Sequence, residues 1–106
     1  LFIDADVLVR GDTLTRVLDT FSKDPELAAV FGSYDTEPSA PDFLSQYRNL
    51  LHHYVHQKSR SDASTFWSGC GAIKKDLFLE MGGFDRVKFS KPSIEDIELG
   101  YRMRRK

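Results

Sequence analysis

The chain has 106 residues, of which 41% are hydrophobic and 29% charged, the composition of an ordinary globular domain. Its formal net charge of −1 gives no electrostatic case for nucleic-acid binding, and its single cysteine, Cys70, excludes an internal disulfide. A lone thiol favours a reducing compartment, so we expect a cytoplasmic location. No apolar run approaches the length of a membrane span, and we therefore expect a soluble chain.

Residues 1–7 form an apolar stretch that ends in two carboxylates, Asp4 and Asp6. Such a stretch predicts a buried strand with charge at its carboxyl end, where open α/β sheets bind their ligands. Residues i and i+2 of a strand share a face, so the two carboxylates can converge on one hard cation, Mg²⁺ or Mn²⁺. The alternative is a turn after the strand, because Asp is a common turn former.

The next part of the chain predicts a helix, a strand and a loop. Residues 27–34 are a second apolar strand, and with the helix before it they predict a βαβ unit with a right-handed crossover. Residues 35–41 carry two of the four prolines and predict a loop, the candidate linker. The helix is indicated by Asp12 at its N-cap and by apolar residues at helical spacing, namely Leu14, Val17, Leu18 and Phe21.

Residues 43–55 predict an amphipathic helix with Asp42 near its N-cap. The segment around its end carries all three histidines, His52, His53 and His56. His52 and His56 stand four residues apart and can share a helix face, which is the geometry of some zinc sites. No acid accompanies them in the pattern of a zinc protease, so we assign them solvent contacts or ordinary hydrogen bonds and no chemistry.

Residues 65–73 predict a strand that leads through a tight bend into a short helix capped at Gly82. Gly69 and Gly71 permit either a positive φ or the close approach of another group to the backbone. A lone GxG pattern is weak evidence for phosphate binding, and Trp67 is a core residue in the structural interpretation.

The last motif places Glu95 and Asp96 in the first turn of a helix. Ser93 and Asp96 resemble a capping box, and acids in a first turn complement the helix dipole, so a structural interpretation explains both. In the functional interpretation, a carboxylate at a helix start that faces a cleft accepts a proton. The helix N-terminus stabilises the anion, so such a base would act late, on a hydroxyl already acidified by bond formation.

Four motifs follow one another along the chain, namely Asp4-x-Asp6, Ser68-Gly69-Cys70-Gly71-Ala72, Met81-Gly82-Gly83-Phe84-Asp85 and Glu95-Asp96-x-x-Leu99-x-x-Arg102. In this order and at this spacing they resemble the family-2 glycosyltransferases of the GT-A fold, and the resemblance spans nearly the whole chain. It implies a partial GT-A fold of the α/β class, a mixed and mostly parallel sheet with flanking helices that lacks the N-terminal nucleotide-binding half. Residues 1–106 would be a single fragment of the catalytic domain, inactive alone.

The resemblance also implies roles for individual residues. Asp4 and Asp6 would be the DxD motif, which holds a divalent cation, Mg²⁺ or Mn²⁺, on the diphosphate of a nucleotide-sugar donor. Glu95 and Asp96 match the ED motif, with Asp96 as the general base of an inverting transfer to an acceptor hydroxyl. The implied donor- and acceptor-binding residues are Asp4, Trp67, Gly69, Gly71 and Arg102.

The implied partners are a nucleotide-sugar donor and a carbohydrate or lipid-linked acceptor, as in polysaccharide or glycolipid biosynthesis. Membrane association, at the cytoplasmic face, would come from regions outside this chain. Two other classes stay open. One is a non-catalytic metal-binding or interaction module, in which Asp4 and Asp6 make a turn and residues 93–96 only cap a helix. The other is a metal-dependent phosphotransferase or hydrolase, which uses the acidic pair and leaves Glu95 and Asp96 unexplained.

Overall fold

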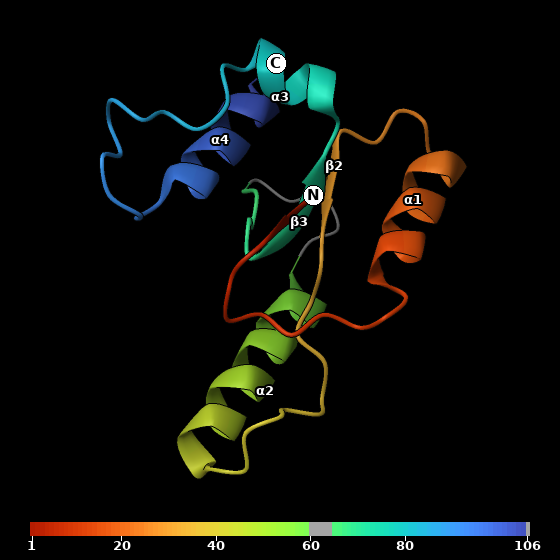
Figure 1. The fold of residues 1–106 in the computed structure, drawn as a ribbon, viewed down its shortest axis with the longest axis vertical. Helices are drawn as coiled ribbons and strands as arrows, with labels where there is room; N and C mark the ends of the chain where they lie inside the picture. The colour runs from red at the N-terminus through yellow and green to blue at the C-terminus, as the bar shows by residue number, and fades with distance from the viewer. Residues whose placement is uncertain (60–64, 106) are drawn as a thin grey trace. The chain divides into compact units, whose positions relative to one another are not determined.

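The computed structural model describes residues 1–59 and 65–105 (Figure 1). The chain divides into two compact units. Unit 1 is formed by Leu1–Phe31 and Ser64–Lys106, and unit 2 by Gly32–Ala63. The chain thus leaves unit 1 after its second strand and returns to it for the rest of the sheet. The acidic motifs all belong to unit 1, and the histidines belong to unit 2.

Unit 1 contains a three-stranded sheet in the order β1 (Phe2–Ile3), β3 (Cys70–Ile73), β2 (Ala29–Phe31). The central strand β3 runs antiparallel to both neighbours. The structure confirms the α/β class, but the predicted mostly parallel sheet is wrong. β1 and β2 do point in the same direction, as a βαβ unit requires, yet β3 lies between them and reverses every pairing. The apolar pattern of a strand marks its burial and leaves its direction open.

Helices α1 (Thr13–Lys23), α3 (Lys75–Glu80) and α4 (Glu95–Arg104) belong to unit 1. Asp12 is the N-cap residue of α1, as predicted, although its side chain makes no capping hydrogen bond. The predicted stop after α3 is confirmed, because Gly82 (φ 78°) and Gly83 (φ 66°) adopt the left-handed conformation that favours glycine.

Helix α2 (Phe43–Lys58) is the helix of unit 2, and its start follows the sequence prediction. The Asp42 carboxylate accepts a hydrogen bond of 2.9 Å from the backbone N–H of Ser45, which is an N-cap interaction. Hydrogen bonding from the Ser45 side chain, and then from its backbone, lowers the pKa of Asp42 below its ordinary value. The cap therefore stabilises α2 chiefly when Asp42 is ionised.

The core of unit 1 is small and aromatic. Among the described residues, the buried hydrophobic side chains are Phe66, Ala72 and Leu99. The Phe2 ring packs beside this core, with its centroid 6.2 Å from that of Phe66 and 5.2 Å from that of Phe84. Leu99 is fully buried, so the middle turn of α4 packs into the interior of unit 1.

At Gly100, helix α4 lies close to the backbone of Thr65 and Phe66. A Cβ atom added to Gly100 would lie 2.5 Å from Cα of Thr65 and would also overlap the backbone nitrogen of Phe66. Glycine inside a helix normally destabilises it relative to alanine. Here the missing side chain permits a contact that no other residue type allows.

Candidate functional site

The acidic pair lies on a turn. β1 ends at Ile3, and the backbone N–H of Val7 donates to the carbonyl of Asp4 at 3.1 Å. The premise that Asp4 and Asp6 share the face of one strand is therefore wrong, and the alternative of a turn after the strand describes the backbone correctly. Both residues are exposed, so the turn presents two carboxylates to solvent.

Asp4 is attached to the start of β3 by its backbone. Its N–H donates to the carbonyl of Gly69 at 3.0 Å, which extends the β1–β3 ladder by one residue beyond the pair of Ile3 with Cys70. The acidic turn consequently begins where the Ser68-Gly69 segment enters the sheet.

The Asp96 carboxylate contacts the same segment. Its Oδ2 accepts hydrogen bonds from the backbone N–H of Ser68 at 3.1 Å and from the Ser68 hydroxyl at 3.2 Å, and its Oδ1 accepts from the backbone N–H of Ile97 at 2.7 Å. Asp96 is half-buried. Asp4 and Asp96 thus contact consecutive residues, Gly69 and Ser68, and the structure brings the two predicted acidic motifs to one end of β3.

The predicted capping box between Ser93 and Asp96 is wrong. Helix α4 begins at Glu95, so its N-cap residue is Ile94, whose side chain makes no capping hydrogen bond. The Glu95 carboxylate accepts from the backbone N–H of Ser93 at 2.7 Å, which leaves the Asp96 carboxylate to the two donors of Ser68. Glu95 also lines a hollow of about 220 Å³, together with Phe84, Asp85, Arg86, Phe89, Ser90, Lys91 and Pro92.

Of the two roles that the sequence permits for Gly69 and Gly71, the structure shows the close approach of other groups to the backbone, and neither glycine has a positive φ. A Cβ atom on Gly69 would lie 2.5 Å from Cζ2 of Trp67, and one on Gly71 would lie 2.7 Å from Cζ of Phe66. The Trp67 ring thus approaches Gly69, and the backbone carbonyl of Trp67 and the Phe66 ring approach Gly71. Trp67 is half-buried, with its indole over Gly69, close to the segment that Asp4 and Asp96 contact.

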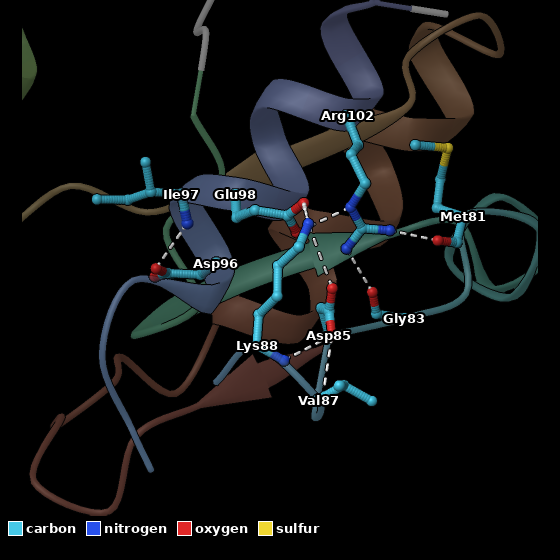
Figure 2. Close-up of polar contacts among 9 residues, drawn as sticks. All are labelled: Met81, Gly83, Asp85, Val87, Lys88, Asp96, Ile97, Glu98 and Arg102. Carbon is cyan, nitrogen blue, oxygen red and sulfur yellow. Dashed lines mark hydrogen bonds and ion pairs between the residues drawn. The ribbon is translucent and has the colours of Figure 1, made fainter. Parts of the chain in front are cut away.

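Arg102 lies in a network that fastens α4 to the turn after α3 (Figure 2). Its Nε donates to Oε2 of Glu98 at 2.8 Å, its Nη2 donates to the carbonyl of Gly83 at 2.7 Å, and its Nη1 donates to the carbonyl of Met81. The contacts drawn for Arg102 lead to these three residues and none leads to Asp96. All three guanidinium nitrogens thus make protein contacts.

The same network extends to Asp85 of the predicted Gly82-Gly83-Phe84-Asp85 motif (Figure 2). Lys88 Nζ lies 3.5 Å from Oδ2 of Asp85 and 3.8 Å from Oε1 of Glu98. Hydrogen bonds from the backbone N–H groups of Lys88 and then Val87 lower the pKa of Asp85. The carboxylate of Asp85 therefore holds the loop after Phe84 in place.

The histidines of unit 2 make local contacts. His53 Nδ1 lies 2.6 Å from the carbonyl oxygen of Tyr34, and the His52 ring stacks on the Tyr34 ring with centroids 5.1 Å apart. Burial lowers the pKa of His56, and the neighbouring His52 and His53 lower it further. His56 is thus biased toward its neutral form.

Sequence reasoning missed two residues that organise this site. Ser68 belongs to the Ser68-Gly69-Cys70-Gly71-Ala72 motif, but nothing in its spacing from Asp96 predicts that its hydroxyl and N–H donate to that carboxylate. Gly100 was visible as a glycine inside an otherwise regular helical pattern, which is a usable signal for a close backbone contact.

Within residues 1–59 and 65–105, no group of three or more His, Cys, Asp or Glu side chains is arranged to hold a metal ion. In the same part of the chain, no helix has the length and apolar character needed to cross a bilayer. No family model, curated protein or solved structure matches this sequence. The chemical interpretation of the site therefore comes from its own residues and their arrangement.

Proposed function

We propose that the chain is part of the catalytic domain of an inverting glycosyltransferase, which transfers a sugar from a nucleoside-diphosphate donor to an acceptor hydroxyl. One observation carries the proposal: Asp4 and Asp96 are hydrogen-bonded to consecutive residues, Gly69 and Ser68. The exposed acidic turn could bind a cation at the diphosphate of the donor, and the oriented Asp96 carboxylate could accept the proton of the acceptor hydroxyl.

Asp96 would act as the general base. Three hydrogen bonds from Ser68 and Ile97 hold its carboxylate in one orientation. Two carboxylate oxygens offer about four lone-pair directions, so acceptor capacity is left for a substrate hydroxyl. As the hydroxyl oxygen attacks the anomeric carbon, its proton passes to Asp96 and the diphosphate leaves from the opposite face. A single displacement of this kind inverts the configuration at that carbon.

The donor set of the acidic turn fits a hard divalent cation. Mg²⁺ is commonly held by one or two carboxylates, with substrate phosphates and water completing its six ligands. The exposed carboxylates of Asp4 and Asp6 supply this number from one turn. When bound, such a cation would offset the negative charge that gathers on the diphosphate leaving group.

Arg102 and Glu95 would support the site from either side of Asp96. We assign Arg102 a positioning role, because its guanidinium fixes α4 against the carbonyls of Met81 and Gly83. Glu95 faces the hollow beside the start of α4, where an acceptor can enter. Gly69, Gly71 and Trp67 would form the wall between the acidic turn and α4.

The test is sugar transfer by the complete enzyme that contains this chain, followed by mass spectrometry of donor and product. Asp96→Asn should lower kcat by roughly 10² to 10⁴, because general base catalysis contributes about that much. Asp76→Asn is the matched control, since Asp76 is the second residue of α3 as Asp96 is of α4, and it should leave kcat unchanged.

Three outcomes would contradict the proposal. Near-native turnover by folded Asp96→Asn would show that Asp96 is not the general base. An equal loss of kcat in Asp76→Asn would show that acids in a first helical turn affect activity only through stability. Donor hydrolysis that needs no acceptor would assign the acidic turn to a hydrolase.

A further inference from the structure

Glu98 of α4 contacts two cations, Arg102 of the same helix and Lys88 of the loop after Phe84 (Figure 2). Its Oε2 accepts from Arg102 Nε at 2.8 Å, and its Oε1 lies 3.8 Å from Lys88 Nζ. A Glu four residues before an Arg is the favourable order for such a pair on a helix. Arg102 therefore occupies one carboxylate oxygen and leaves the other for Lys88. Glu98 thus joins α4 to a segment outside it, and the proposed function gives it no role.

Residues 85–92, called the Lys88 loop, form a turn whose own hydrogen bonds are local. The backbone N–H of Phe89 donates to the carbonyl of Asp85 at 3.0 Å. The Asp85 carboxylate accepts from the N–H groups of Val87 at 3.0 Å and of Lys88 at 2.9 Å. These bonds join residues at most four apart, so they shape the turn without attaching it to another element. Lys88 Nζ, which lies 3.5 Å from Oδ2 of Asp85, connects the turn to α4.

The same loop and the first turn of α4 together line the hollow of about 220 Å³. Residues 84–86 and 89–92 line it from the loop, and Glu95 lines it from the helix. In the part of the chain that the structure describes, the ion pair of Lys88 with Glu98 is the polar contact between the Lys88 loop and α4. Neither partner of this ion pair lines the hollow, so the pair sets the shape of the hollow from outside it.

The setting of the Lys88 ammonium decides what its removal does. An exposed ion pair contributes little to stability by itself, and the Lys88 side chain is 65% exposed. The side chains of Asp85 and Glu98 are only 29% and 20% exposed, and both carboxylates face this one ammonium. Without it they would repel each other, because like charges in a partly dry setting are poorly screened. The expected response is a shift of the Lys88 loop away from α4, with little unfolding.

We propose that Glu98 is a positioning residue for the acceptor: through Lys88 it holds the Lys88 loop against α4 and so sets the width of the hollow. The inference rests on the proposed function, in which the acceptor enters this hollow beside Glu95. It adds to the site a residue that acts through another side chain and has no contact with the acceptor.

The first test is steady-state transfer by the complete enzyme that contains this chain. Glu98→Gln keeps an oxygen for Arg102 and loses the charge that attracts Lys88, whereas Lys88→Met keeps the length of the side chain without its ammonium. Each should raise the KM for the acceptor about three- to fivefold and leave kcat and the donor KM unchanged. Lys88→Arg should restore the acceptor KM. A merely structural role would lower the folded fraction, and hence the apparent kcat, without changing KM.

The double variant shows whether the two residues act through one contact. Glu98→Gln combined with Lys88→Met should raise the acceptor KM no further than the larger of the two single changes. Lys75→Met is the matched control, because Lys75 is an exposed lysine at the first position of α3, and it should leave both KM values and kcat unchanged.

The second test needs no activity and uses the 106-residue chain. The amide hydrogens of Val87 and Lys88 are donated to Asp85, so their exchange with solvent reports how often the Lys88 loop opens. Glu98→Gln should raise both exchange rates about three- to fivefold, and Lys75→Met should leave them unchanged.

The inference is overturned if Glu98→Gln leaves the acceptor KM or the two exchange rates unchanged, if Lys75→Met has the same effect, or if the two single changes simply multiply in the double variant. An equal rise in the donor KM would also overturn it. Failure of the proposed function has a separate signature, near-native kcat in Asp96→Asn, which none of these measurements involves.

Discussion

Replacing Arg102 gives the sharpest test of how α4 is held. Arg102→Ala removes the ion pair with Glu98 and the hydrogen bonds to the carbonyls of Met81 and Gly83. Hydrogen bonds with one charged partner contribute about 1.5–3 kcal/mol each. The Arg102 and Glu98 side chains are 28% and 20% exposed, so water replaces part of what is lost. We expect the free energy of unfolding to fall by about 2–4 kcal/mol.

Two companion variants separate geometry from charge. Arg102→Lys keeps the positive charge but not the planar fork that reaches three acceptors, so it should recover only about half of the loss. Arg104→Ala removes an exposed arginine from the same last turn and should change the stability by less than about 0.5 kcal/mol. The assay is urea unfolding followed by the fluorescence of Trp67, the chain's single tryptophan.

If Arg102→Ala unfolds with the free energy of the unchanged chain, or if Arg104→Ala is destabilised as much as Arg102→Ala, Arg102 does not hold α4 in place. A direct ligand-binding role for Arg102 would give another pattern. In that case Arg102→Lys would weaken donor or acceptor binding by the complete enzyme while its unfolding free energy stayed the same.

Gly100→Ala should destabilise the chain by about 1–3 kcal/mol in the same unfolding assay, because the new Cβ overlaps backbone atoms; a gain in stability would contradict the close contact. The pKa of His56 is below its ordinary 6.5, so the unfolded chain binds this proton first as pH falls. Melting temperature should therefore drop below about pH 6.5, and less so in His56→Gln. Ser68→Ala should lower kcat about tenfold, with donor affinity kept, if it orients Asp96. Asp6→Ala should abolish the Mn²⁺ dependence of donor binding, and unchanged affinity with and without Mn²⁺ would remove Asp6 from the metal site.

The sequence predicted local structure well and pairing poorly. Helical spacing located α1 and α2, and a glycine pair marked the end of α3, because these signals lie within one turn of the chain. The direction of β3 relative to β1 and β2 depends on contacts between segments that are far apart in the sequence, and a local sequence pattern does not indicate these contacts. The mostly parallel sheet was implied by the family resemblance, and both strand pairs of the described sheet are antiparallel.

The candidate site divides in the same way. The carboxylates of Asp4, Asp6 and Asp96 stood out because acids that end an apolar strand or begin a helix are visible in the sequence alone. The contacts from the Asp96 carboxylate to Ser68 and from the Asp4 N–H to Gly69 were not visible, because the two partners stand 28 positions apart in the first contact and 65 in the second. The capping box was predicted wrongly for a related reason. The Asp96 carboxylate accepts hydrogen bonds from Ser68, which is distant in sequence, and not from the nearby backbone N–H of Ser93.

The contact at Gly100 has a consequence for where Asp96 sits. The two residues stand four apart in α4 and so share one helix face, with Gly100 against the backbone of Thr65 and Phe66 and Asp96 against Ser68. Sliding the helix by one residue, about 1.5 Å, would bring a side chain into the space that only glycine fits. Gly100 therefore sets the register of α4 along this segment, and with it the position of the Asp96 carboxylate one turn away.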